Sequence, residues 1–289
     1  MYLPYRGQWT QGPNLVSPVL RFSRSLLAGL VLLAAPLAEA LADAVDILPH
    51  RAVYRMELSA LRGGSSVVDV TGRMDFEWRD ACDAWTVSQR MRILVGYGDG
   101  NEIDFGLTLN TWESKDGLNY RFFIRQLTGG RDGEETRGKA QLEGEGQGGE
   151  AALALPDEKT VPLPAGTLFP TEHTQVLLES AGREVWPLWR TVFDGSGEGG
   201  LFGVSAALIE AVAAESNVAE GLEAIKDQPS WRLRLAYFDL GDPAAAEPEQ
   251  EQALRIYANG VLDELVLDFP EFSVRAVLEK LEPLGAPGC

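Results

Sequence analysis

One glycine spacing in the chain is typical of a nucleotide site. Gly195, Gly197 and Gly200 match G-x-G-x-x-G, whose glycines let a backbone approach pyrophosphate at the start of a helix. That chemistry needs a βαβ unit and an acidic residue about 20 positions further on. The flanking sequence instead predicts antiparallel strands in an acidic chain, so we interpret the motif as a glycine-rich loop and expect no cofactor. Ser196 within it lacks the G-x-S-x-G spacing of a nucleophile elbow.

Histidines and carboxylates are the other candidates for chemistry. His50 and His173 are the two histidines, and with no H-x-x-H or C-x-x-C spacing we expect no metal site and interpret His173 as a first-turn helix residue. Asp104 and Glu113 can meet across a sheet as the acid and base of a hydrolase. Among 43 acidic residues some pair always fits such a pattern, so we favour a solvated acidic surface and expect no enzyme.

Cys82 and Cys289 are the two cysteines of the chain, and Cys289 is its last residue. Their chemistry depends on the compartment, because two cysteines form a disulfide most simply in an exported chain and stay free thiols in the cytosol. We predict a Cys82–Cys289 disulfide, which would tie the C-terminus to an early strand. The loop-entropy model gives about 5 kcal/mol for a closure of this size, as an upper figure.

The N-terminal residues predict export. Two arginines precede the apolar run Leu26–Leu37, and Ala38-Glu39-Ala40 follows as a small-x-small cleavage signal. The run is about 12 residues long, shorter than the roughly 20 that span a bilayer. We therefore predict a signal peptide over residues 1–42, cleaved near Ala40 or Ala42, and a periplasmic protein that does not span the membrane.

The net charge of the chain excludes one class of partner. At −18 the surface repels nucleic-acid phosphates and anionic lipid headgroups, so we expect no nucleic-acid binding. A basic partner fits this surface better.

Alternation of apolar and polar residues is the main structural signal. In the segment after Cys82, the apolar side chains occupy odd positions and the polar ones lie between them, as in a strand with one buried and one wet face. The apolar residues are Trp85, Val87, Met91, Ile93 and Val95. The same rhythm predicts two strands before this one, with Val68 on the buried side, and two after it, joined by short turns. Short turns favour an antiparallel sheet.

Three later segments complete the expected elements. Pro170 opens a helix that ends near Ala181, with Gly182 as the C′ residue, before a strand over residues 186–193. Residues 204–215 fit a strand or a helix. Asn259-Gly260 predicts a two-residue hairpin turn with positive φ at both positions, between two of the last strands.

Six tryptophans of the expected domain allow two interpretations. They pack the core of a large sheet, or several line an open apolar groove for an acyl chain or a peptide. The six are Trp78, Trp85, Trp112, Trp186, Trp189 and Trp231.

Four motifs in this order resemble the EipB family of alphaproteobacterial cell envelope integrity proteins. They are the segments 82–90 (CDAWTVSQR), 169–174 (FPTEHT), 192–196 (VFDGS) and 257–261 (YANGV). The resemblance runs from about His50 to Cys289 and implies a mainly β fold, an incompletely closed antiparallel β-barrel or β-spiral around one short helix. It also implies the Cys82–Cys289 disulfide and a periplasmic tetratricopeptide-repeat partner, without established catalysis.

We therefore expect a single β-spiral domain over residues 43–289 that supports envelope integrity by protein–protein interaction. Two other hypotheses remain open. The first is a carrier of an acyl chain or lipoprotein in the concave face, and the second is a hydrolase built on an acidic pair.

Overall fold

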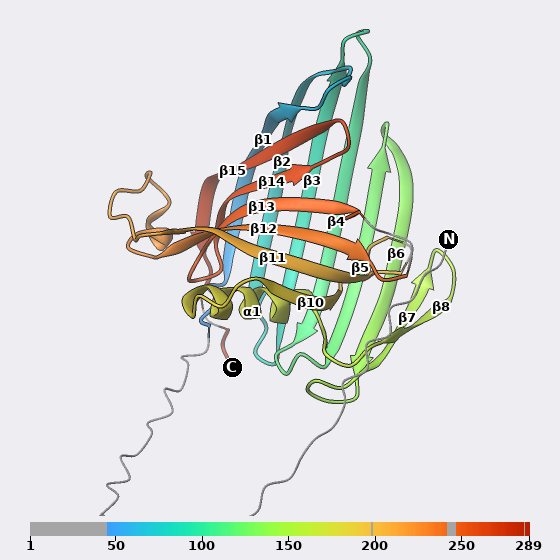
Figure 1. Ribbon diagram of the computed structural model, residues 1–289, viewed down its shortest axis with the longest axis vertical. Coiled ribbons are helices and arrows are strands. Elements are labelled where there is room, and N and C mark those ends of the chain that lie inside the picture. Colours follow the sequence, from blue (N-terminus) through green and yellow to red (C-terminus); the bar gives the residue numbers. More distant parts are fainter. Residues whose placement is uncertain (1–44, 198, 242–246, 286) are drawn as a thin grey trace, which may run out of the picture. The chain divides into compact units, whose positions relative to one another are not determined.

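The computed structural model describes residues 45–197, 199–241, 247–285 and 287–289. The expected signal peptide, residues 1–42, lies outside them. In the described part the chain forms one 15-stranded sheet, one α-helix and one short 3₁₀ helix (Figure 1). No helix there is long and apolar enough to cross a bilayer.

The first half of the chain makes a meander of eight strands. They are β1 (His50–Leu61), β2 (Val67–Asp80), β3 (Ala84–Tyr97), β4 (Glu102–Ser114), β5 (Asn119–Thr128), β6 (Arg131–Leu142), β7 (Gly149–Leu155) and β8 (Lys159–Leu163). Each pairs antiparallel with the next, as the short turns predict.

The second half of the chain begins at the other edge of the sheet and continues strand by strand until it pairs with β1. Its elements are β9 (Thr167–Leu168), α1 (Pro170–Gly182), β10 (Leu188–Phe193), β11 (Leu201–Val212), η1 (Glu223–Ile225), β12 (Ser230–Asp239), β13 (Gln250–Tyr257), β14 (Leu262–Asp268) and β15 (Phe272–Pro283). β9 pairs parallel with β10, and β15 pairs antiparallel with β1. The ambiguous segment 204–215 is therefore largely strand β11.

The sheet curls into a nearly closed barrel whose seam lies between β8 and β9. These two strands are the ends of the sheet order, although they follow each other in the chain. β8 carries Pro162, which has no backbone N–H to donate, and β9 is two residues long. Both edges are thus poor templates for an added strand. The expected mainly β, incompletely closed barrel with one short helix is confirmed.

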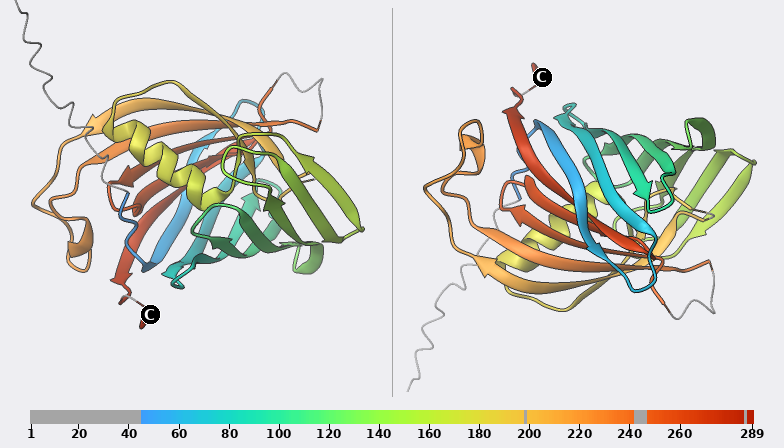
Figure 2. Two further views of the ribbon diagram at one scale, coloured as in Figure 1. Left: turned by 90° about the horizontal axis from the view of Figure 1, so that it is seen from below. Right: turned by 90° about the horizontal axis from the view of Figure 1, so that it is seen from above.

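Buried side chains point to the concave inner face, where they form three clusters. Phe169 and Phe193 lie at 0% exposure beside Tyr120, and the stacked Tyr120–Phe169 ring centroids are 5.2 Å apart. Leu177 and Leu178 of α1 pack in a second cluster with Trp78 and Leu233. The helix runs across one end of the sheet, as the left view of Figure 2 shows. α1 thereby anchors two parts of the inner face that are distant in sequence.

The end of α1 differs from the expectation. Gly182 is its last helical residue, Arg183 is the cap, and Glu184 takes the left-handed conformation with φ 56°. Val185 N donates to Ser180 O at 2.9 Å and Glu184 N to Ala181 O at 3.3 Å, which is the Schellman pattern with Glu184 as C′. The next strand starts at Leu188 rather than at residue 186, after the cis peptide before Pro187.

Two local β predictions were wrong. The hairpin between β13 and β14 is a three-residue loop, because Gly260 N donates to Tyr257 O and Tyr257 N to Val261 O, and Gly260 has positive φ whereas Asn259 does not. Val68 is 60% exposed instead of buried. A register shift between Val67 and Asp69 turns Val67 inward in its place.

Candidate functional site

Cys82 lies in the tight turn that joins β2 to β3. Its φ is 68°, and its amide donates to the Asp80 carboxylate at 2.8 Å, while Lys115 bridges to Asp80 at 2.7 Å. The structure links Cys82 to Cys289 with their Cα atoms 6.1 Å apart, inside the range that a disulfide spans. The chain thus presents the two cysteines in bonding geometry, and formation of the bond in the mature protein stays a prediction.

Glu113 of β4 holds the start of α1. Its side chain is 2% exposed, and its two carboxylate oxygens accept hydrogen bonds from the backbone amides of Thr171 at 2.8 Å and Glu172 at 2.9 Å. A helix leaves its first amides without partners inside the helix, so this distant carboxylate caps it. Burial raises the pKa of Glu113 to about 7, and the two amides act in the opposite direction. The role of Glu113 is structural.

Asp104 and Glu113 do not form an acid–base pair. They lie near opposite ends of β4 and, nine residues apart, on opposite faces of the strand. Asp104 accepts from Arg92 Nε at 2.9 Å on the outer face. Glu113 points inward to α1. These two residues therefore cannot serve as the acid and base of a hydrolase, because an odd spacing along one strand separates two side chains across the sheet. A hydrolase built on another acidic pair stays a hypothesis.

Both histidines are buried in the described structure. His173 lies in the first turn of α1, as expected, but it faces the interior, and burial with the nearby Arg190 charge lowers its pKa to about 4. His50 Nδ1 lies 2.7 Å from Leu48 O, and burial lowers its pKa too. The Nε2 atom of each has no hydrogen-bond partner among the described residues. No group of three metal-ligating side chains is found in this part of the chain.

The glycine motif forms the loop between antiparallel β10 and β11. Asp194 N and Gly195 N approach Gly200 O, and the amide and hydroxyl of Ser196 donate to Asp194 Oδ1 at 2.8 and 2.7 Å. Tyr120 donates its hydroxyl to Asp194 O at 3.2 Å. Gly195, with φ 80°, lies against the Phe122 ring. The loop is therefore packed onto β5 and has none of the βαβ context of a dinucleotide site.

The tryptophans divide between the two faces of the sheet. Trp78 is buried, and Trp85, Trp186 and Trp231 pack around the same inner cluster. Trp189 is 52% exposed on the outer side, beside Phe238. Trp112 is also outside, because it neighbours the inward-pointing Glu113 in β4. Core packing thus explains four of the six, and the other two lie on the outer surface.

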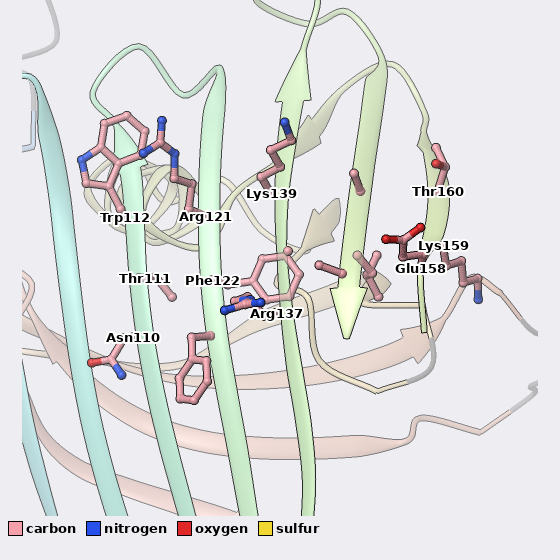
Figure 3. A pocket seen from close by; sticks show the side chains of 15 residues that line it. Asn110, Thr111, Trp112, Arg121, Phe122, Arg137, Lys139, Glu158, Lys159 and Thr160 are labelled. Atoms are coloured by element: carbon pink, nitrogen blue, oxygen red, sulfur yellow. The ribbon is translucent and has the colours of Figure 1, made fainter. Parts of the chain in front are cut away.

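A groove of about 900 Å³ crosses the outer face from β4 to β8 (Figure 3). Its aromatic part is Trp112 with Phe123, and the Arg121 guanidinium lies 4.9 Å from the centre of the Trp112 ring. Arg137 and Lys139 of β6 continue it, followed by Ala152 and Thr160 on the next two strands. We did not single out these cations from the sequence. Alternation in β5 nevertheless predicts that Arg121 lies on the outer face, because its neighbours Tyr120 and Phe122 are buried on the inner one.

The comparisons with known proteins agree with this fold. Residues 41–285 match the EipB-like family model. The cell envelope integrity protein EipB of Brucella abortus (strain 2308) is 30% identical over 253 residues, which cover 85% of this chain and 87% of that protein. The crystal structure of a beta-barrel-like protein of domain of unknown function DUF1849 from Brucella abortus superposes with a TM-score of 0.75 at 27% identity, covering 84% of this chain and all of that one. On these matches, the chain belongs to the EipB-like family.

Proposed function

We propose that this protein is a non-enzymatic periplasmic protein that supports cell envelope integrity by binding another protein, namely a periplasmic tetratricopeptide-repeat protein. The observation that carries the proposal is the match along 85% of the chain to an envelope integrity protein. The partner class rests on the family resemblance.

The buried carboxyl groups support a binding role over catalysis. Glu113 accepts two helix amides, and Asp194 accepts the amide and hydroxyl of Ser196. A general base needs a lone pair within reach of a substrate proton. Both groups instead fix the positions of α1 and of the β10–β11 loop.

The outer side of α1 is one surface for the helical-repeat protein. Glu179 is exposed there and Glu172 is half-buried, on a chain of net charge −18. The two sheet edges are poor templates for strand addition, so side chains must supply the contact. Such a contact is electrostatic in part and weakens as salt screens it.

A titration with the periplasmic tetratricopeptide-repeat candidate at about 50 mM and about 300 mM salt tests the proposal, because these two values bracket the change in screening length. We expect weaker binding at high salt and a further loss with Glu179→Lys. Glu102→Lys makes the same charge change at the start of β4 and should bind like the wild type. Salt-independent binding, or equal loss in both variants, would contradict docking on α1.

Export is tested separately. Expression of the full chain followed by N-terminal sequencing of the mature protein should give a start just after Ala40 or Ala42. Recovery of the intact leader in the inner membrane would contradict a periplasmic protein.

A second candidate function is a carrier of an acyl chain on the inner face. Several inward apolar side chains stay half-buried there, among them Met91, Leu107 and Leu254, and the buried indole nitrogens of Trp78 and Trp186 lack hydrogen-bond partners among the described residues. A fluorescent fatty-acid displacement assay distinguishes the two functions. Tight, saturable displacement without any protein partner would favour the carrier.

A further inference from the structure

The strand register aligns the groove residues in two rows on the outer face of β4–β8. Trp112 is opposite Arg121, Arg121 is opposite Lys139, Lys139 is opposite Ala152, and Ala152 is opposite Thr160. The second row places Asn110 opposite Phe123 and Phe123 opposite Arg137. Arg121, Lys139 and Arg137 therefore form one cationic cluster beside two aromatic rings.

The three cations of this cluster lack carboxylate partners among the described residues. Arg121 and Lys139 face each other directly across β5 and β6, an arrangement that destabilises a sheet. The chain has 43 acidic and 25 basic residues, so carboxylates are abundant. Of the residues that line the groove, Glu158 is the acidic one, and it makes no ion pair with the three cations.

A second row of like charges on the same outer face provides the contrast. Arg55, Arg73 and Arg92 lie opposite one another on β1, β2 and β3. Each has its own carboxylate, since Arg55 pairs with Glu279 at 3.1 Å, Arg73 with Asp75 at 2.7 Å, and Arg92 with Asp104. The sheet neutralises that row internally. The cluster of the groove leaves its positive charge available to a ligand.

We propose that this groove binds an extended acidic segment of a protein partner, with an apolar side chain of the segment against Trp112 and Phe123. This inference rests on the proposed function, because it takes the ligand of the groove to be part of a protein partner. Guanidinium groups bind carboxylates in a bidentate manner, and the stack on Trp112 holds Arg121 in place. Four inter-strand spacings from β4 to β8 span about 19 Å. That length accommodates about six extended residues.

The net charge favours a peptide segment over a membrane surface. A chain of −18 is repelled by a sheet of anionic headgroups as the whole molecule approaches it. A short acidic segment brings its charge only to the cluster, within the about 10 Å over which exposed charges interact at moderate salt. We therefore propose a peptide segment as the ligand and include lipid phosphate as the competing outcome of the experiment below.

The test uses the mature protein and a fluorescein-labelled peptide of about eight residues that alternates glutamate with leucine, a length that spans the groove. We expect saturable binding that falls about tenfold with Lys139→Glu, because the change reverses one charge of the cluster. The same variant should keep or raise the melting temperature, since it converts a like-charge pair into an opposite-charge pair. Lys280→Glu, an exposed residue of β15 with the same charge change, should bind within about twofold of the wild type.

Matched probes identify the ligand chemistry. A peptide with glutamine in place of glutamate should not bind. Equal binding of the two peptides, or equal binding by wild type and Lys139→Glu, would overturn the proposal. Phosphatidylglycerol vesicles or inorganic phosphate that bind in a Lys139-dependent manner, without peptide binding, would assign the groove to phosphate. A dimer that Lys139→Glu abolishes would assign it to a second copy of the chain.

The tetratricopeptide-repeat protein separates this inference from the proposed function. If it binds wild type and Lys139→Glu equally while the acidic peptide does not bind, the groove inference fails and the proposed function stands. If it fails to bind the wild type while the acidic peptide binds in a Lys139-dependent manner, that partner is wrong and the groove inference stands.

Discussion

The carboxylate of Glu113 on β4 accepts the backbone amide of Thr171 at 2.8 Å, so a strand residue caps a helix that begins 57 residues further along the chain. This contact fixes where α1 lies on the inner face. It also explains a buried carboxyl that sequence patterns alone associate with acid–base chemistry.

Glu113→Gln should lower the free energy of unfolding by about 1–3 kcal/mol, because its NH2 group replaces one of the two oxygens that accept the helix amides and cannot itself accept a hydrogen bond. Asp104→Asn is the matched control, since it removes only an exposed ion pair with Arg92 and should cost at most about 1 kcal/mol. Urea unfolding of the two variants measures the difference. Equal losses would contradict the capping role.

The raised pKa of Glu113 adds a pH dependence to that comparison. The carboxyl is protonated more readily in the folded chain than in the unfolded one. Its contribution to the free energy of unfolding is therefore complete below pH 4.5 and is lost as pH rises to about 7. The stability difference between wild type and Glu113→Gln should therefore shrink over this interval. A constant difference would show that the helix amides cancel the effect of burial.

His173 gives stability the opposite pH dependence to Glu113. Its folded pKa of about 4 lies below the ordinary value of 6.5, so its contribution is present above pH 6.5 and is lost as pH falls through about 4. His173→Gln should flatten the acid limb of the stability profile relative to wild type. Thermal unfolding at several pH values measures this. An unchanged acid limb would mean that His173 titrates normally.

Cys82→Ser should lower the free energy of unfolding by about 2–4 kcal/mol, because the bond restricts the unfolded chain. The double variant Cys82→Ser/Cys289→Ser should have the same melting temperature as the single variant. A reducing agent should bring the wild type to that temperature too. Peptide mapping of periplasmic protein without reduction checks the bond directly. Two free thiols would refute it.

Gly195→Ala should destabilise the chain by about 1–3 kcal/mol, since an added Cβ would overlap the Phe122 ring and Gly195 has positive φ. Gly199→Ala meets no neighbour and should change stability by less than about 0.5 kcal/mol. Melting temperatures of the two variants compare them. A large effect at Gly199 instead would contradict the described packing of the loop.

The sequence by itself determined the strands, because alternation is a local property of a half-buried sheet. The odd positions of the segment from Trp85 to Val95 face inward as the pattern predicts. Local signals failed where the register shifts, as at Val68, or where a turn admits several lengths, as at Asn259.

The tertiary structure decided the roles of the polar residues. The odd spacing along β4 already separates Glu113 from Asp104, but whether Glu113 caps a helix depends on which face of β4 meets α1. The cationic cluster exists because β5 and β6 pair in the register that sets Arg121 opposite Lys139. Contacts between residues distant in the chain follow from strand order and register. A local pattern of side chains predicts neither the order nor the register.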